Sequence, residues 1–343
     1  MAKKRAKADK QAKPSNQSQD AKIGKEKAAK AKATKAEAAK DEASKQAKES
    51  KAAQSKPSKP SKPSKSEQAK SKPKPSTLAE RADRFDCYQR AVQSPEHEVE
   101  FFEQAYRDVH RRKPLLLRED FCGTFAVCCE WVKSDPRRKA VGVDLCGETL
   151  QWGREHNLAK LTETQAKRVR LLEQDVRKRN QPHVDVLAAQ NFSFWIFKTR
   201  PEVIDYFKIA RANLNPGGIL VMDMMGGGEC YNVGNVDKRK IGKGKHSFRY
   251  DWEQGYFNPV NADCSFYIHF KFKDGSKLRH AFEYHWRFWT LPEVLEMLRE
   301  AGFSETHTYW EQEDANGEDT GEWKRATENP SHPSWLCYVV AVK

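Results

Sequence analysis

Short runs of apolar residues alternate with amphipathic segments between residues 114 and 223. The runs are flanked by turn residues such as Pro, Gly, Asn and Asp, and they predict short strands that are buried on both faces. Because such strands alternate with helices, the pattern predicts an α/β fold with a mainly parallel, doubly wound sheet. The five predicted strands are residues 114–117, 140–145, 169–173, 184–190 and 219–223.

Two helices are expected before the first strand. Residues 95–110 begin with proline, which suits the first turn of a helix, and repeat apolar side chains at helical spacing. With a preceding helix at 79–92, capped by Ser76 or Thr77, this segment predicts an N-terminal helical lid over residues 77–112. Further helices are predicted at residues 124–132, 148–156, 201–214 and 291–301.

The pattern changes after residue 224. A loop rich in Gly and Lys precedes segments in which aromatic and polar residues alternate, as they do in antiparallel strands. Asp274-Gly275 is a strong hairpin signal between two of these segments. A strand at 306–310, an acidic loop and a strand at 335–342 are expected to complete a seven-stranded central sheet. Within an insertion at 226–290 we expect a three-stranded antiparallel β-meander, with strands at 246–257, 264–272 and 278–289.

The positive charge of the chain is concentrated in its first 76 residues. The whole chain has a formal net charge of +14, whereas residues 1–76, with 23 basic and 8 acidic side chains, carry +15 and the remainder carries −1. The basic segment has too few apolar residues to offset the entropy cost of folding. We therefore expect a disordered tail rich in Lys, Ala, Ser and Pro at 1–76, followed by one domain at 77–343.

Two roles are open for this tail. Lys3-Lys4-Arg5-Ala6-Lys7 is similar to a basic nuclear-import signal, and the lysines also suit a weak contact with nucleic-acid phosphates. Lysine-rich tails are equally common as solvated extensions without a partner. The sequence contains no signal-peptide pattern and no apolar run long enough for a membrane helix, so we expect a nuclear or cytoplasmic protein without membrane contact.

Eight cysteines are scattered along the chain without a Cys-x-x-Cys pair or a Cys/His cluster at zinc spacing. We therefore expect no metal site, and we expect free thiols in a reducing compartment. The pattern leaves the oligomeric state open.

Polar residues follow several predicted strands at their carboxyl ends, where an open α/β sheet binds its ligands. Asp144 lies 21 residues after Gly123, the spacing at which a dinucleotide-type fold presents the acid that binds a ribose diol. Asp175 lies just past the third strand, and Asn191-Phe192 follow the fourth. Each residue alone is more often a cap or a turn residue, and only their joint occurrence in this order indicates a ligand site.

Residues 77–343 resemble the class I S-adenosylmethionine-dependent methyltransferases. More narrowly, they are similar to a branch with the signature Leu-Arg-Glu-Asp-Phe-Cys-Gly-Thr, which stands here at residues 117–124. The resemblance implies a Rossmann-like methyltransferase sheet, S-adenosyl-L-methionine as cofactor and methyl transfer as the reaction, but no particular acceptor. Further matches to the branch lie at residues 141–144, 191–193, 197–200, 216–218, 252–254, 274–276 and 289–293.

Under this resemblance the cofactor is expected at the ends of the first four strands. Asp144 would bind its ribose, Asp175 its adenine amine and the loop at 118–124 its amino-acid end. We favour Asp120 over Glu119 as the residue of this loop that faces the ligand. The complete set of expected cofactor residues is Arg118, Glu119, Asp120, Cys122, Gly123, Asp144, Leu145, Asp175, Val176 and Asn191.

The loop departs from the acidic-x-Gly-x-Gly-x-Gly pattern that is usual in the superfamily. Only Gly123 remains, and Cys122 and Phe125 stand near positions where glycine is common. We therefore expect the loop to cross the cofactor in a different backbone conformation. Cys122 is better explained as a small buried residue than as a reactive thiol.

The methyl acceptor is expected beside the fourth strand and beneath the inserted meander. Aromatic side chains there suit either a cationic amine or a flat ring, although half of the aromatic residues of a meander simply pack on the core. Tyr88 is expected to act as a lid over the site. The expected acceptor-site and catalytic residues are Asn191, Phe192, Tyr88, Tyr231 and Trp252, with Tyr250, Tyr284, His285, Trp286 and Arg287 as further candidates.

A roofed site favours a small-molecule acceptor that is methylated at N or O. A second hypothesis is an RNA or protein methyltransferase tethered by the basic tail, but the net charge of −1 on the domain provides no basic platform. A third hypothesis is a non-catalytic cofactor-binding or scaffold protein. The missing glycines favour it, whereas Asp144, Asp175 and Asn191 argue against it.

Overall fold

The computed structural model describes residues 76–180, 182–317 and 319–343. Lys74–Lys343 form one compact unit. The predicted basic tail lies outside the described residues except for Ser76. No helix in the described part of the chain is long and apolar enough to cross a membrane.

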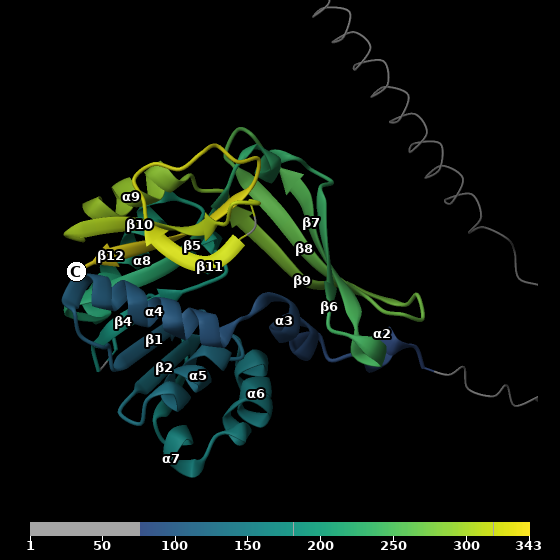
Figure 1. The fold of residues 1–343 in the computed structure, drawn as a ribbon, viewed down its shortest axis with the longest axis horizontal. Helices are drawn as coiled ribbons and strands as arrows, with labels where there is room; N and C mark the ends of the chain where they lie inside the picture. Colours follow the sequence, from purple (N-terminus) through teal and green to yellow (C-terminus); the bar gives the residue numbers. More distant parts are fainter. Residues whose placement is uncertain (1–75, 181, 318) are drawn as a thin grey trace, which may run out of the picture. The chain divides into compact units, whose positions relative to one another are not determined.

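A central sheet of eight strands forms the middle layer of this unit (Figure 1). Its order is β11-β10-β12-β5-β4-β1-β2-β3, and the five strands from β5 to β3 run parallel to one another. The predicted mainly parallel sheet is confirmed, and strand β12, which is antiparallel to β5 and β10, adds an antiparallel end to it. The strands are β1 Leu116–Asp120, β2 Lys139–Asp144, β3 Val169–Glu173, β4 Val184–Ala189, β5 Leu214–Gly226, β10 Glu305–Glu313, β11 Asp319–Arg325 and β12 Trp335–Val342.

The eighth strand, β11, corrects the prediction of seven strands and an acidic loop. It pairs with β10 in antiparallel fashion, and only one of its side chains, Trp323, is buried. Trp323 packs against Phe101 and Tyr338 with ring centroids 5.9 and 4.5 Å apart. Since one buried ring among six exposed residues gives no alternating pattern, the sequence could not show this edge strand.

Helices cover both faces of the central sheet, and the side chains of each strand alternate between the two. Ile219 and Val221 of β5 belong to the core cluster on one face, whereas Leu220 and Met222 belong to the cluster on the other. Helices α4 Pro95–His110 and α5 Ala126–Ser134 contribute to the first cluster, and α8 Arg200–Asn213 and α9 Leu291–Glu300 to the second. The remaining helices of this part are α6 Gly147–His156 and the single turn α7 Glu163–Ala166.

The single helix predicted at 79–92 is two helices in the structure, α2 Leu78–Arg81 and α3 Arg84–Val92. The break has a local cause, because the Asp83 carboxylate accepts hydrogen bonds from the backbone N–H groups of Phe85 and Asp86. An aspartate that caps a new helix ends the previous one in favour of extended backbone. Helix α3 therefore takes its own direction.

A second, antiparallel sheet is inserted between β5 and α9, and it has four strands where three were predicted. Strand β6 forms its edge and lies in the segment predicted to be a loop. Four consecutive residues of β6 are exposed and charged or polar, a composition typical of protected edge strands. Helix α3 packs against this sheet through Cys87 in a third apolar cluster. The strands are β6 Val236–Ile241, β7 Phe248–Phe257, β8 Asp263–Lys271 and β9 Lys277–Arg287.

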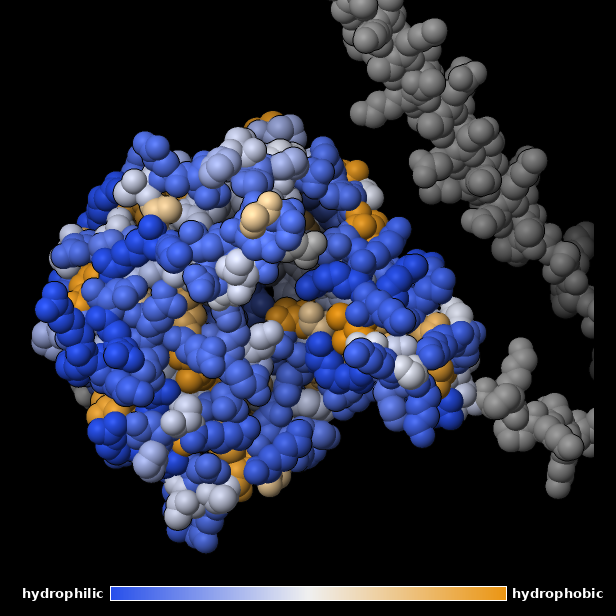
Figure 2. All heavy atoms as spheres, viewed as in Figure 1, coloured by the Kyte–Doolittle hydropathy of each residue, from blue (hydrophilic) through white to orange (hydrophobic). Residues whose placement is uncertain are grey.

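The face of the unit shown in Figure 2 is largely hydrophilic. It is hollowed between β11 and α3, and apolar side chains gather beside the hollow. This hollow lies near the carboxyl ends of the parallel strands, where an α/β sheet binds its ligands.

Candidate active site

Strained backbone is concentrated at the carboxyl ends of β1 and β4. Of the seven non-glycine residues with positive φ in the described part of the chain, four lie there, namely Phe121 (55°), Phe125 (47°), Asn191 (58°) and Phe192 (55°). A left-handed conformation costs an L-residue about 1–2 kcal/mol. Residues held in this way cluster at ligand sites in many proteins, so their position indicates where a ligand binds.

The loop between β1 and α5, residues 121–125, is called the first loop below. In an acidic-x-Gly-x-Gly-x-Gly pattern that begins at Glu119, the three glycine positions fall on Phe121, Gly123 and Phe125. All three have positive φ, with 51° at Gly123. All three positions thus have a backbone conformation that glycine adopts without strain, and Phe121, not Cys122, occupies the first glycine position.

Side-chain packing holds the two phenylalanines of this loop in a conformation that glycine adopts more easily. The Phe125 side chain is fully buried, and the Phe121 ring lies 5.8 Å from the ring of Tyr206 and 6.2 Å from that of Phe197. Cys122 is buried, as expected for a small packing residue. Burial also raises the pKa of its thiol well above the ordinary value, which opposes a reactive role.

Asp144 connects the first loop to the loop that follows β2. Its carboxylate accepts hydrogen bonds from the backbone N–H groups of Gly123 and Cys146, both at 2.8 Å. The next residue, Leu145, is 72% exposed although it is a large apolar side chain. A side chain added at Gly123 would meet only Thr149, at 3.7 Å, so the loop is open at this point. A carboxylate, an apolar side chain and open backbone thus meet at one edge of the sheet.

The structure does not support Asp120 as the ligand-facing acid. Its carboxylate is buried and accepts hydrogen bonds from the Arg118 guanidinium at 2.6 Å and from the Tyr206 hydroxyl at 3.1 Å. Glu119 points to the opposite face of β1, where it accepts a hydrogen bond from the Cys128 N–H at 3.1 Å. Burial raises the pKa of Glu119 to about 7. Both acids are therefore engaged within the protein.

Arg118 and Val176 position the segment after β3. The Arg118 guanidinium donates to the Val176 carbonyl at 2.8 Å, which ties the end of β1 to this segment. Asp175 is partly exposed and pairs with Arg177 at 2.7 Å, and this hydrogen bond lowers its pKa. The Gln174 side-chain nitrogen is buried without a hydrogen-bond partner in the described part of the chain. Sequence reasoning missed this orphaned donor, which lies where the adenine amine was expected.

The turn after β4 is held by a residue that the sequence analysis did not select. The N–H groups of Asn191 and Phe192 donate to the two carboxylate oxygens of Asp223 on β5, at 2.8 and 3.0 Å. Burial raises the pKa of Asp223 to about 6. The side-chain oxygen of Gln190, next to this turn, is buried without a partner among the described residues. Asp223 thus fixes the left-handed turn from inside the sheet.

A cavity of about 250 Å³ opens beside this turn. It is bounded by α3 and α4, by the ends of β4 and β5, and by the inserted sheet as its roof. We call it the acceptor cavity. Its lining residues are Tyr88, Val92, Glu98, Asn191, Phe192, Asp223, Met225, Asp237, Arg239, Tyr250, Trp252, Ile268, Tyr284, Trp286, Leu336 and Tyr338.

The structure places four of the five expected acceptor-site residues in this lining: Tyr88, Asn191, Phe192 and Trp252. Tyr231 is not among them. Its ring packs against Phe257 and Phe288, with centroids 5.0 Å apart in both cases. Of the further candidates, Tyr250, Tyr284 and Trp286 line the cavity, whereas His285 and Arg287 do not.

Glu98 is the second acid in this cavity that sequence reasoning missed. It lies on α4 and accepts a hydrogen bond from the Tyr338 hydroxyl at 3.2 Å. Burial is the main cause that raises the pKa of Glu98 to about 8, and the nearby Asp223 adds to it. No sequence signal marks Glu98, because it lies among other acidic residues in the first turns of α4.

Helix α3 links the acceptor cavity to the first loop. Tyr88 lines the cavity, while the next residue, Gln89, accepts a hydrogen bond from the Thr124 hydroxyl at 3.2 Å. Asn157 donates to the Gln89 side chain and to the Thr124 carbonyl, both at 2.9 Å. The helix is therefore fixed to the loop by side-chain hydrogen bonds.

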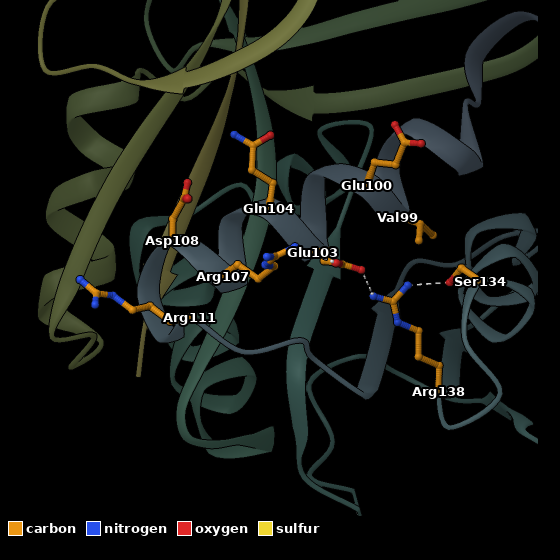
Figure 3. A pocket seen from close by; sticks show the side chains of 9 residues that line it. All are labelled: Val99, Glu100, Glu103, Gln104, Arg107, Asp108, Arg111, Ser134 and Arg138. Carbon is orange, nitrogen blue, oxygen red and sulfur yellow. Dashed lines mark hydrogen bonds and ion pairs between the residues drawn. The ribbon is translucent and has the colours of Figure 1, made fainter.

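A larger hollow of about 650 Å³ lies along α4, away from this site. Its lining side chains pair with each other, as Figure 3 shows for Arg138, which donates to Glu103 and Ser134. Arg138 immediately precedes β2, so the hollow lies at the amino end of the strands. That edge is not where an α/β sheet binds its ligands.

Comparison with solved structures identifies the architecture. The amino pentose methyltransferase CalS10 from Micromonospora echinaspora has a TM-score of 0.54 at 16% identity, over 75% of this chain and 95% of its own. DesVI from Streptomyces venezuelae has a TM-score of 0.56 at 15% identity, over 76% and 98% of the two chains. The sugar N-methyltransferase KedS8 from a Streptoalloteichus species has a TM-score of 0.52 at 14% identity, over 82% and 99%.

The chain has the class I methyltransferase fold. No protein-family description and no curated protein sequence matches it, so the likeness lies in structure and not in overall sequence. The fold confirms the Rossmann-like sheet that the resemblance implied. Two parts of the structure were predicted incompletely from the sequence. They are β11 and the four-stranded sheet between β5 and α9.

Proposed function

We propose that this chain transfers a methyl group from S-adenosyl-L-methionine to a small-molecule acceptor bound in the acceptor cavity. The observation that carries the proposal is the meeting of the left-handed first loop with Asp144, which Gly123 holds at the ends of β1 and β2. The structural likeness to CalS10, an amino pentose methyltransferase whose structure contains S-adenosylmethionine, supports it.

The described residues fit this cofactor. Asp144 offers carboxylate oxygens to a ribose diol, and the exposed Leu145 offers an apolar surface to the adenine ring. Past β3, Asp175 and the unpartnered Gln174 side chain provide polar atoms for the base. The open backbone at Gly123 leaves room for the amino-acid end. The bound cofactor would supply a methyl group on a positively charged sulfur.

The contribution of the chain to such a transfer is to position the acceptor and exclude water. The turn at Asn191-Phe192 forms one wall of the acceptor cavity, and Tyr88 and Trp252 approach from α3 and β7. A cavity that is roofed by a second sheet suits a small molecule better than a long polymer. The domain's net charge of −1 also offers no basic surface to a nucleic acid.

Isothermal titration calorimetry of the full chain with S-adenosylmethionine tests the cofactor assignment. We expect wild-type binding, and we expect Asp144→Ala to weaken it by at least about tenfold, because a ribose contact of about 1.4 kcal/mol is lost. Asp205→Ala, an exposed acid on α8, is the matched control and is expected to bind like the wild type.

Wild-type affinity in Asp144→Ala would refute the ribose assignment, and absence of binding to the wild-type chain would refute the proposed function. An assay with labelled methyl groups on fractionated metabolites, RNA and protein would then test the acceptor class. Incorporation confined to the polymer fractions would contradict a small-molecule acceptor.

A further inference from the structure

The acceptor cavity contains more negative than positive side chains. Three carboxyl groups line it, on Glu98, Asp223 and Asp237, and Arg239 is the one guanidinium among the lining residues. Arg239 is already engaged, since it pairs with Asp237 at 3.3 Å and stacks over the Tyr250 ring at 4.6 Å. Among the described residues, neither Glu98 nor Asp223 forms an ion pair. These two acids therefore face the cavity without a cation.

The two acids also have incomplete hydrogen bonding for charged carboxylates. Glu98 accepts from the Tyr338 hydroxyl, and Asp223 accepts from two backbone N–H groups. After burial, the nearby Asp223 is the next largest cause that raises the pKa of Glu98, because charges of one sign in a shielded cavity repel. A bound cation would relieve that repulsion and complete the contacts of both groups.

Aromatic rings surround the same space. Tyr284 lies between Trp252 and Trp286, with ring centroids 5.7 and 4.5 Å away. Tyr88 and Tyr250 complete the aromatic lining. Ring faces attract an ammonium group within about 6 Å of their centroids, and carboxylates provide its hydrogen-bond acceptors. A carboxylate substrate would be repelled by two unpaired acids, and a neutral alcohol would lack the charge attraction that an ammonium group gains there.

We propose that the methyl acceptor is a small aliphatic amine, that it enters as an ammonium ion between Glu98 and Asp223, and that Glu98 removes its proton. This inference rests on the proposed function and specifies its substrate class. Glu98 is a catalytic residue under this proposal because it contacts the reacting nitrogen. Asp223 is a binding residue that also holds the Asn191-Phe192 turn.

The step balances as follows in atoms and electrons. The ammonium group gives one proton to the Glu98 carboxylate and becomes a neutral amine with a free lone pair. The nitrogen then forms a bond to the methyl carbon while the carbon–sulfur bond breaks, and its electron pair stays on sulfur. The product is a methylated ammonium ion and a neutral thioether, and Glu98 returns its proton to water.

Binding of a cation should strengthen as pH rises through the pKa values of Asp223, about 6, and Glu98, about 8. Below these values the acids are neutral and attract no cation. The other titratable or charged groups that face this pair from the surrounding elements are Tyr88 on α3, Glu119 on β1, Asp237 and Arg239 on β6, Tyr250 on β7, Tyr284 on β9 and Tyr338 on β12.

Calorimetry with two probes of equal size tests the inference without measuring turnover. Choline carries a fixed positive charge, and 3,3-dimethylbutan-1-ol is its uncharged carbon analogue. With the full chain saturated with S-adenosylhomocysteine, we expect choline to bind at least about tenfold more tightly at pH 8. We also expect the ratio of the choline affinity to the affinity of its uncharged analogue to shrink at pH 5. Equal affinities at pH 8 would overturn the proposal.

Glu98→Gln should abolish most of the choline preference while S-adenosylmethionine affinity stays unchanged. Glu96→Gln, an exposed neighbour on the same helix, is the matched control and should behave like the wild type. Equal losses for choline and cofactor in Glu98→Gln would overturn the proposal, because Glu98 would then serve the cofactor's own ammonium group.

Tyr338→Phe provides a second variant if Glu98→Gln does not fold. Loss of the Tyr338 hydroxyl raises the pKa of Glu98 further, so the pH midpoint of choline binding should move upward. An unchanged midpoint would count against Glu98. If the wild-type chain binds S-adenosylmethionine but shows no choline preference, this inference fails while the proposed function stands. If it binds no cofactor, the proposed function itself fails.

Discussion

The two halves of the candidate site differ in how their acidic side chains are paired. At the ends of β1 to β3, Asp120 pairs with Arg118 and Asp175 pairs with Arg177, while Asp144 accepts hydrogen bonds from two backbone N–H groups. In the acceptor cavity at the ends of β4 and β5, two acids have no cationic partner among the described residues. The first half therefore contains two ion pairs, whereas Glu98 and Asp223 in the second half form none among the described residues.

The pKa values of these acids depend on their partners and on their burial. In the first half, the hydrogen bond from Arg177 lowers the pKa of Asp175, whereas burial raises the pKa of Asp120 although Arg118 opposes that shift. Unpaired acids in a shielded cavity have raised pKa values, about 8 for Glu98 and about 6 for Asp223. Acids with such pKa values can exchange a proton near neutral pH, as acid–base chemistry requires, and so can the buried Glu119 of the first half, whose pKa is about 7.

The largest effect is expected when the buried ion pair between Arg118 and Asp120 is removed. Arg118→Met leaves the Asp120 carboxylate buried without its cation, which should lower the free energy of unfolding by about 3–5 kcal/mol in urea denaturation. Arg177→Met removes an exposed pair and should cost less than about 1 kcal/mol. A similar loss in both variants would show that burial of the Arg118 pair is not what distinguishes it.

A pH-dependent effect is expected in the unpaired half. Glu98 has a pKa of about 8 in the folded protein against an ordinary value of 4.5, so the stability that its proton provides is complete below pH 4.5 and is lost as pH rises through 8. Glu98→Gln removes this loss. Its melting temperature should match the wild type at pH 4 and exceed it by roughly 10 °C at pH 9. A constant difference between pH 4 and pH 9 would contradict an unpaired Glu98.

The smallest effect is expected from the left-handed backbone of the first loop. At a residue with positive φ, glycine should be more stable than alanine by about 1 kcal/mol, the difference expected for a left-handed L-residue. We therefore expect Phe121→Gly to unfold at a higher urea concentration than Phe121→Ala, although both lose the same ring contacts. The reverse order would mean that the first loop relaxes out of the left-handed conformation when the ring is removed.

The parallel sheet could be predicted because its strands are continuous apolar runs. The first strand was nevertheless placed at 114–117 instead of Leu116–Asp120. Its last three residues are charged, and only the tertiary structure shows that they are buried against Tyr206, Cys128 and the segment after β3. Hydropathy assigns charged residues to loops, so a strand that ends in paired charges is predicted too early.

The acids of the acceptor cavity were not predictable for a different reason. Glu98 meets Tyr338 only because β12 pairs with β5 in the register that sets Tyr338 opposite Asp223. No local pattern carries information about a register between segments more than one hundred residues apart. Asp144, by contrast, was found because its distance from Gly123 is set by one strand–helix–strand unit.

Helix α3 contacts both halves of the candidate site. Gln89 and Gln93 accept from the Thr124 hydroxyl of the first loop, and Tyr88, on the same nine-residue helix, lines the acceptor cavity. A helix of this length moves as a rigid rod. Any ligand that favours one position of Thr124 therefore biases the position of the Tyr88 hydroxyl, and thermodynamic reciprocity requires an occupant of the cavity to bias the loop by the same free energy. The two substrates of such a protein would be coupled through this one helix, in addition to their direct contact at the transferred methyl group.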